Sequence, residues 1–495
     1  MKSTKRQTEP QPAMADAPRE GDRRAPGGWA RYALASAALL APCFWQSRIQ
    51  AGDLGSHIYN AWLAELIRHG RAPGLSIVPQ KTNVLFDLLL SFLFRTVGSP
   101  AAQRIAVSLA VLVFAWGAFA LVSLVARREW ALLPLIAMLA YGWVFHMGFF
   151  NFYLSLGLCL WALVLGWNLA PWRLLAAVPI LLVAFAAQSL PVGWACAVLG
   201  FLWLARRRPA KRGQLILAAV GAILALRIAL SFAMSTIWVP GQIRSVTGVD
   251  QVWVYDDKYL IGAAGMLLVC VLLVAESIRR SGARRLFGGE LFQVLALTAA
   301  GVFLLPTWVS VPGYQHALVF IAERMSLVVG VFVVAVAATA SPRPWHRWAT
   351  GVLAAVFFFF LYFDERALNG FEDQTSAAVA QLPPMARVVN NVDADLRVNA
   401  LSHIVDRVCV ARCFSYANYE PSSAAFRIRV TGPNPIVAAT DMDSSRMQIG
   451  QYTVQEHDLP LYRISAAADG SLVVDNMPAG TQIGVTQWQG LPGLP

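Results

Sequence analysis

Charged residues are scarce in this sequence, and their scarcity argues against a soluble globular protein. Asp, Glu, Lys and Arg make up 14% of the 495 residues, whereas a soluble domain has about 25%. Hydrophobic residues make up 57%, and they gather in long runs that short charged clusters separate. This pattern predicts a polytopic α-helical membrane protein.

Acidic residues are outnumbered by basic ones, and cysteines are few. The excess of Lys and Arg gives a formal net charge of +12. Cationic loops on the cytoplasmic side of a multi-span protein account for this charge, so we expect membrane lipids and no nucleic acid as partners. Six cysteines in a chain of this length indicate no disulfide framework.

The apolar runs predict about eleven membrane spans. Residues 1–29 are polar and rich in Arg, Pro and Gly, which predicts a disordered cytoplasmic tail. We interpret the run 32–48 as an uncleaved first span that enters the membrane from the cytoplasm. Ten further runs are long enough, or nearly so, to cross a bilayer: 102–126, 131–147, 148–169, 173–187, 189–205, 214–232, 259–275, 291–309, 317–340 and 349–363.

The distribution of Lys and Arg orients these spans. All positive clusters fall on the cytoplasmic side if residues 83–98 do not cross, and we interpret that short segment as a helix at the outer interface. The clusters lie at 127–128, 173, 206–212, 279–285 and 343–347. We therefore expect a multi-pass plasma (inner) membrane protein with a cytoplasmic N-terminus. The membrane domain covers 30–363 and includes an external loop at 49–101.

Residues 364–495 differ in composition from the rest and predict a small extracytoplasmic domain, either α+β or β-rich. Alternating stretches such as 425–430 and 471–475 are typical of half-buried strands. Cys409 and Cys413 lie in this domain, on the side of the membrane where thiols oxidise, so a disulfide between them is plausible. A paired metal site is the alternative, but no second pair of ligands is evident.

A short stretch after the first span combines an acid and a histidine at helical spacing. It begins Gly-Asp-Leu-Gly-Ser-His, with Asp53 and His57 four residues apart. Residues at this spacing lie on one face of a helix, which Gly70 and Pro73 then end. The motif therefore predicts an external helix that presents Asp53 and His57 together.

The chain is expected to have an external Asp-x-x-x-His helix that ends in Gly-x-x-Pro. One span with a cytoplasmic N-terminus precedes this helix, and about ten spans follow it. In this arrangement the chain resembles the GT-C superfamily of membrane glycosyltransferases. The local match covers about 25 residues, from Asp53 to Pro73. Many members carry a second acidic residue in the external loops, and Glu65 and Asp87 are the nearest candidates here. The resemblance implies transfer of a sugar from a polyprenyl-phosphate donor to an acceptor on the outer face, as part of cell-envelope chemistry.

The resemblance also implies roles for the two motif residues. Asp53 would orient or deprotonate the acceptor, and its alternative role is that of a helix N-cap. His57 could bind a metal with Asp53, hydrogen-bond the donor phosphate or face water. A divalent metal could take part, but the sequence does not require one.

Other polar residues on the outer side are candidates for binding the donor. Arg324, Arg227 and Arg244 could hold its phosphate, because a guanidinium can grip phosphate with two hydrogen bonds. Arg324 is preferred; it follows Glu323 and His316 near the outer end of the tenth span, and His316 is a further candidate for binding the donor. His146 and Asn151 lie in an external turn and could face the same cavity.

Two other classes of function stay open. A transporter or flippase of a lipid-linked saccharide would have a polar site near the bilayer midplane, and the sequence has no internal repeat that favours it. A non-catalytic scaffold for envelope assembly would use the external domain to bind partners, with a purely structural Asp53–His57 helix. The discriminating feature is whether Asp53 points into a cavity that also holds an arginine.

Overall fold

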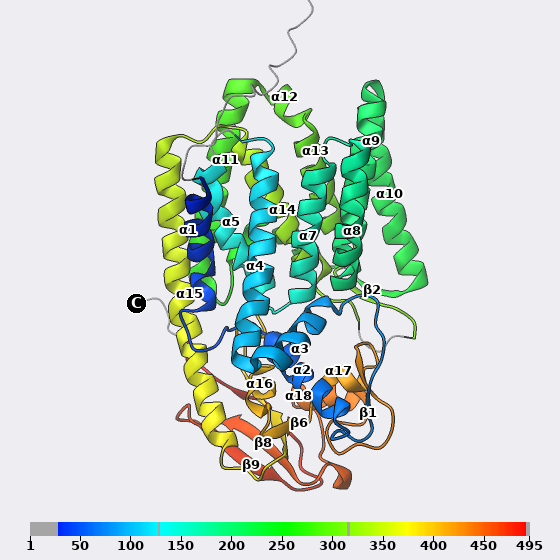
Figure 1. Ribbon diagram of the computed structural model, residues 1–495, viewed down its shortest axis with the longest axis vertical. Coiled ribbons are helices and arrows are strands. Elements are labelled where there is room, and N and C mark those ends of the chain that lie inside the picture. Colours follow the sequence, from blue (N-terminus) through cyan, green and yellow to red (C-terminus); the bar gives the residue numbers. More distant parts are fainter. Residues whose placement is uncertain (1–27, 127–128, 314–316, 492–495) are drawn as a thin grey trace, which may run out of the picture.

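The computed structural model describes residues 28–126, 129–313 and 317–491 (Figure 1). Long helices lie side by side in an elongated bundle, and a smaller unit of short helices and strands covers its lower end. The helices of the bundle are α1 (Gly28–Leu40), α4 (Ser99–Ser123), α5 (Leu133–Ala140), α7 (Phe150–Gly166), α8 (Pro171–Ala187), α9 (Ser189–Arg207), α10 (Arg212–Ala233), α11 (Leu260–Ser281), α13 (Glu290–Leu304), α14 (Ile321–Ala338) and α15 (Pro344–Val379).

The apolar helices are compatible with a membrane protein. By length and composition, 6 described helical stretches could each cross a bilayer: Ser99–Ser123, Glu129–His146, Ser189–Arg207, Pro209–Ala233, Asp257–Ser281 and Ile321–Ala338. Helices α7, α8 and α13 are apolar but shorter. The predicted helical class is confirmed, and the count of eleven spans stays a prediction.

The helices of the bundle differ in how deeply they are buried. Most residues of α14 and α7 are buried, 14 of 18 and 13 of 17, so both helices lie in the interior of the bundle. Helix α10, by contrast, has no buried residue and exposes large apolar side chains such as Leu217 and Phe232. A helix that is apolar on its exposed side suits contact with lipid chains rather than with water.

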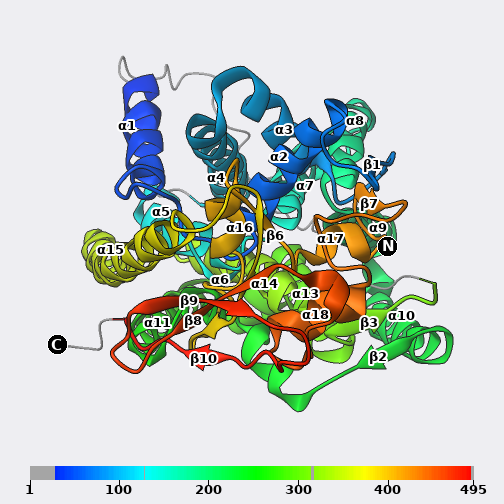
Figure 2. The same ribbon diagram turned by 90° about the horizontal axis from the view of Figure 1, so that it is seen from below.

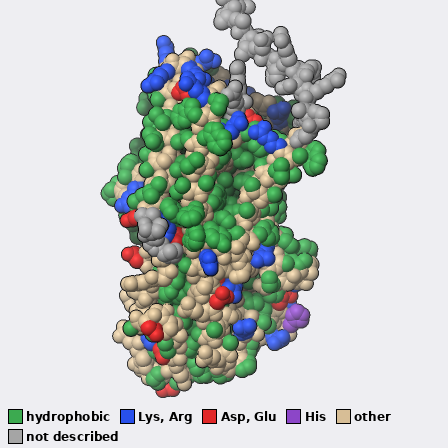
Figure 3. All heavy atoms as spheres, turned by 90° about the vertical axis from the view of Figure 1, so that its left-hand side faces the viewer, with side chains coloured by type: hydrophobic (Ala, Val, Ile, Leu, Met, Phe, Trp, Pro, Cys, Tyr) green, Lys and Arg blue, Asp and Glu red, His purple; other side chains and the backbone are tan. Residues whose placement is uncertain are grey.

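Charge is distributed unevenly along the long axis. Figure 3 shows Lys and Arg side chains at the upper end, a largely hydrophobic middle and mixed charges on the lower unit. Arginines occupy the last turns of α9 and α11, whose ends lie in that upper region, together with the short helix α12 (Ala283–Phe287). The lower unit therefore lies at the end of the bundle opposite to these arginines.

The lower unit is built on a four-stranded sheet in the order β6-β4-β8-β9. Strand β4 (Ala386–Asn390) pairs in parallel with β6 (Cys413–Ser415) and β8 (Leu461–Ala466), and β9 (Leu472–Met477) is antiparallel to β8. Further short elements are β5 (Val392–Asp393), β10 (Thr486–Gln487) and the helices α16 (Ile404–Cys409), α17 (Tyr419–Ser422) and α18 (Asp441–Gln448).

Helix α15 links the bundle to the lower unit without a break. Its 36 residues continue through position 364, where the sequence predicted a domain boundary, to Val379. Glu372, in the lower part of α15, is buried and accepts hydrogen bonds from Arg407 Nε of α16 at 2.8 Å and from Gln50 Nε2 at 2.9 Å. This charged contact joins α15, α16 and the chain segment that leads to Asp53.

The predicted external loop 49–101 lies between the bundle and the lower unit. It contains α2 (Leu54–Arg68), β1 (Leu75–Ile77) and α3 (Leu85–Val97), and β1 pairs antiparallel with β7 (Ile428–Val430). Seen from below, α16 lies between α15 and α2 (Figure 2). The helix with the Asp-x-x-x-His motif is therefore held by both parts of the molecule.

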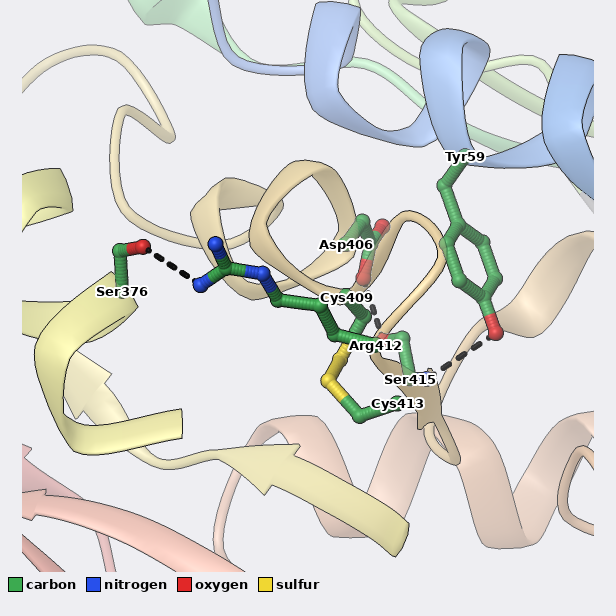
Figure 4. The surroundings of a disulfide bond; sticks show 7 residues. All are labelled: Tyr59, Ser376, Asp406, Cys409, Arg412, Cys413 and Ser415. Carbon is green, nitrogen blue, oxygen red and sulfur yellow. Dashed lines mark hydrogen bonds between the residues drawn. A yellow bond between two sulfur atoms is a disulfide. The ribbon is translucent and has the colours of Figure 1, made fainter. Parts of the chain in front are cut away.

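The predicted disulfide between Cys409 and Cys413 is present and joins α16 to β6 (Figure 4). Beside it, Asp406 accepts a hydrogen bond from Ser415 Oγ. The backbone N–H of Ser415 donates to the Tyr59 hydroxyl of α2 at 3.0 Å. The disulfide thus closes the turn between two elements that contact α2.

Replacing both cysteines by serine is expected to lower the free energy of unfolding by about 2 kcal/mol, because the bridge closes a short loop in the unfolded chain. The measurement is the thermal or denaturant midpoint of the purified protein, with Cys196→Ser as the control because Cys196 is a free, exposed cysteine on α9. Two alkylatable thiols at 409 and 413 in non-reduced, denatured protein would contradict the pairing.

Candidate active site at the lower end of the bundle

The backbone around Asp53 is fixed by the turn between α6 (Trp143–His146) and α7. The N–H of Gly52 donates to the His146 carbonyl at 2.7 Å, and the N–H of Asp53 donates to the Met147 carbonyl at 3.0 Å. Gly148 has a φ of +82°, and a Cβ there would lie 2.4 Å from the Asp53 nitrogen. Only glycine fits this position, so the turn and Asp53 are in close and rigid contact.

The Asp53 side chain points into a cavity instead of capping its helix. Asp53 occupies the N-cap position of α2, but its carboxylate accepts no capping hydrogen bond from the described first turn. It lines a cavity of about 90 Å³ between the bundle and the lower unit. His403 is the closest described cation, with Nε2 3.7 Å from Asp53 Oδ1.

The cavity also collects three other residues that the sequence proposed. His57, Asn151 and Arg324 line it together with Asp53, and they come from α2, α7 and α14. Aromatic side chains complete much of the wall, among them Phe149 and Phe426. The predicted motif helix and the preferred arginine therefore meet at one site.

His57 is held by a buried carboxylate of α3. Its Nδ1 lies 2.6 Å from Asp87 Oδ1, and Asp87 Oδ2 accepts a hydrogen bond from Asn151 Nδ2 at 2.8 Å. Burial acts to lower the pKa of His57, but the charge and hydrogen bond of Asp87, with the charges of Glu420 and Asp53, raise it to about 9. His57 is therefore a cation at neutral pH, and Asp87 is its counterion.

A second carboxylate in the cavity comes from the C-terminal unit. Glu420 of α17 lines the cavity and accepts a hydrogen bond from Ser56 Oγ at 3.1 Å. Burial and the charge of Asp87 raise the pKa of Glu420 to about 7. Of the two acidic residues suggested by the sequence, Asp87 lies behind His57, and Glu65 pairs with Arg68 and Arg95 away from the cavity.

Arg324 has an unused hydrogen-bond donor. Its guanidinium lies over the ring of Phe149, 3.7 Å from the centroid. Its Nε is buried and has no hydrogen-bond partner among the described residues. A half-buried guanidinium that lines a cavity and has an unpaired Nε is suited to bind an anion, and a phosphate matches its fork of donors.

His403 and Tyr419, like Glu420, lie at the site but were not predicted from the sequence. His403 directly precedes α16, and its Nδ1 lies 2.7 Å from Asp406 Oδ2. Tyr419 lines the cavity, and its ring centroid lies 5.9 Å from that of His403. The His-x-x-Asp spacing of 403 and 406 is visible in the sequence, but nothing local connects it to Asp53.

Gly55 allows α2 to approach His403. A Cβ at Gly55 would lie 2.0 Å from the His403 carbonyl oxygen. Gly55→Ala is therefore expected to destabilise the fold by about 1–3 kcal/mol, since a backbone atom cannot move aside as a side chain can. The thermal midpoint measures this loss. Gly193→Ala is the matched control, because nothing lies within 4 Å of its new Cβ, and equal midpoints for the two variants would refute the expectation.

Three other predicted residues, Arg227, Arg244 and His146, do not line this cavity. Arg227 on α10 lies 4.7 Å over the ring of Trp238, and Arg244 is exposed in the segment Pro240–Val246. His146 is buried, with Nε2 3.2 Å from Glu365 Oε1, and only its backbone carbonyl reaches the segment of Asp53. His316 lies outside the described residues.

An apolar groove of about 660 Å³ adjoins the polar cavity. It is formed by α9, α10, α13 and α14, with side chains such as Trp194 and Met325, and it shares Leu318 with the cavity. Ser189 of the groove directly follows Gln188 of the cavity in the chain. A polar site and a long apolar surface are thus in contact.

Within the described ranges, no group of three or more His, Cys, Asp or Glu side chains is arranged to hold a metal ion. Comparison with known proteins found no matching family model, curated protein or solved structure.

Proposed function

We propose that this chain is a membrane glycosyltransferase that moves a sugar from a polyprenyl-phosphate donor to an acceptor on the outer face of the membrane. One observation carries the proposal. The carboxylate of Asp53 and the guanidinium of Arg324, whose Nε has no hydrogen-bond partner among the described residues, line one cavity, and an apolar groove adjoins it. These features suit an acceptor, a phosphate and a lipid chain respectively.

The chemistry follows from these groups. The acceptor hydroxyl or amide attacks the anomeric carbon of the sugar, and Asp53 takes its proton as the new bond forms. The bond between that carbon and the phosphate oxygen breaks, and its electron pair leaves with the lipid phosphate. Arg324, with the cationic His57 nearby, stabilises the negative charge that develops on the phosphate.

The position of the cavity favours a transferase over a transporter. A transporter is expected to hold its substrate near the middle of the membrane-spanning helices. The cavity instead lies at the end of the bundle, and residues of the C-terminal unit, Tyr419 and Glu420, complete its wall. This arrangement suits an acceptor that approaches from outside the membrane.

The proposal includes a topology. Arginine-rich helix ends lie opposite to the lower unit, and such ends are expected in the cytoplasm. Reporter fusions within 206–212 should therefore give a cytoplasmic signal, and fusions at the C-terminus an external one. Signals from the same side of the membrane would overturn the topology.

The function itself can be tested by analysing the membrane lipids of cells that contain this protein. Mass spectrometry of membrane extracts should show a polyprenyl-phosphate sugar that accumulates when Asp53→Asn replaces the wild-type protein. Lipid-linked sugars that are unchanged between the two strains would contradict a transferase.

A further inference from the structure

We propose that His403 is a positioning residue for Asp53, so that the C-terminal unit completes the active site. In this role His403 lies against the Asp53 carboxylate and keeps it turned into the cavity. The inference rests on the proposed function of Asp53 and adds a residue that touches neither donor nor acceptor.

The two ring nitrogens of His403 lie close to two different carboxylates. Nδ1 lies 2.7 Å from Asp406 Oδ2, within its own unit. Nε2 lies 3.7 Å from Asp53 Oδ1, across the junction with α2. The side chain of His403 is 7% exposed, so water competes little for either nitrogen. The ring therefore joins the supporting carboxylate Asp406 to the Asp53 carboxylate.

Asp406 is itself fixed on its far side. Its other oxygen accepts a hydrogen bond from Ser415 Oγ, and the Ser415 N–H donates to Tyr59 on α2 (Figure 4). The disulfide of Cys409 and Cys413 closes the turn between Asp406 and Ser415. This series of contacts starts at Tyr59 on α2, passes through Ser415 of β6 and Asp406 of α16 to His403, and ends at Asp53. These contacts leave the His403 ring little freedom to turn.

The charges around His403 favour its protonated form. Asp53 faces it from α2, Asp406 from α16, and Glu420 and Tyr419 from α17. Burial acts to lower the pKa of His403, but the charge and hydrogen bond of Asp406, with the charges of Asp53 and Glu420, raise it to about 9. At neutral pH a cation therefore lies beside the Asp53 carboxylate.

His403→Gln tests this role through the pH dependence of sugar transfer. His403→Gln removes the positive charge 3.7 Å from the Asp53 carboxylate, so the acid limb of the kcat profile should move to higher pH. His403→Lys restores a positive charge and should return the limb toward its wild-type position. His69→Gln is the matched control, because His69 is exposed and lies at the opposite end of α2 from Asp53. An unchanged acid limb in His403→Gln would overturn the proposal.

A second measurement does not depend on activity. Thermal midpoints of Asp53→Asn, His403→Gln and the double variant should be non-additive at pH 7, because each single change removes the same charge pair. Additive midpoints would overturn the proposal. If wild-type protein transfers no sugar and the midpoints are non-additive, only the transferase function fails. Should His403→Gln not accumulate, Asp406→Asn serves for the pH profile, since loss of that carboxylate lowers the pKa of His403.

Discussion

Asp53→Asn is expected to abolish nearly all sugar transfer while the protein still folds, inserts and binds donor. Asparagine keeps the size and much of the hydrogen bonding of aspartate but cannot take a proton at neutral pH. General base catalysis contributes roughly 10²–10⁴-fold in rate, or about 3–5 kcal/mol of barrier. The measurement is kcat of the purified variant in lipid vesicles, with donor binding measured separately.

The comparison with helix capping makes this test specific. Asp and Asn cap helices almost equally well, so a capping role would leave the variant active. The Asp53 carboxylate in any case makes no capping bond to the described first turn of α2. Asp373→Asn is the matched control, because Asp373 is an exposed carboxylate that pairs with Arg48 on the surface. Wild-type activity in a well-folded Asp53→Asn protein would remove the catalytic assignment.

Arg324→Lys is expected to weaken donor binding more than it slows the chemical step. Lysine keeps the charge but loses the planar fork and the contact with the Phe149 ring. Each charged hydrogen bond lost costs about 1.5–3 kcal/mol, which corresponds to roughly 10- to 150-fold in KM for the donor. Initial rates over a range of donor concentration give KM and kcat separately.

Arg244→Lys is the control for Arg324. The sequence proposed both residues for phosphate, but Arg244 is exposed outside the cavity, so its replacement should leave KM unchanged. If Arg324→Lys keeps the wild-type KM, or if Arg244→Lys raises it as much, Arg324 does not hold the phosphate.

Local patterns in the sequence were sufficient for the helical class and for part of the site. Asp53 and His57 share a helix face because their spacing matches one turn, and both do line the cavity. Arg324 could be proposed because it lies near the outer end of a predicted span, where a guanidinium can grip a phosphate with two hydrogen bonds. These inferences need only neighbours along the chain.

Tertiary packing determines the positions of the residues that the sequence did not place correctly. His403 and Glu420 reach the site only because the C-terminal unit folds back onto α2, and no periodic pattern records that contact. Asp364 and Glu365 looked like the start of a polar domain, yet both are buried within α15. Asp364 accepts hydrogen bonds from Lys258 Nζ and the Tyr259 hydroxyl, each at 2.6 Å. Paired buried charges look the same as exposed ones in a sequence.

The most direct test of the transferase is to return the accumulated lipid to the enzyme. The polyprenyl-phosphate sugar that accumulates with Asp53→Asn would be purified and incubated with wild-type protein in vesicles together with a membrane extract as the acceptor source. Mass spectrometry should then show free polyprenyl phosphate and loss of the sugar-linked lipid, with no change when Asp53→Asn is used instead. A sugar-linked lipid that wild-type protein leaves intact, or that both proteins consume equally, would contradict catalysis by Asp53.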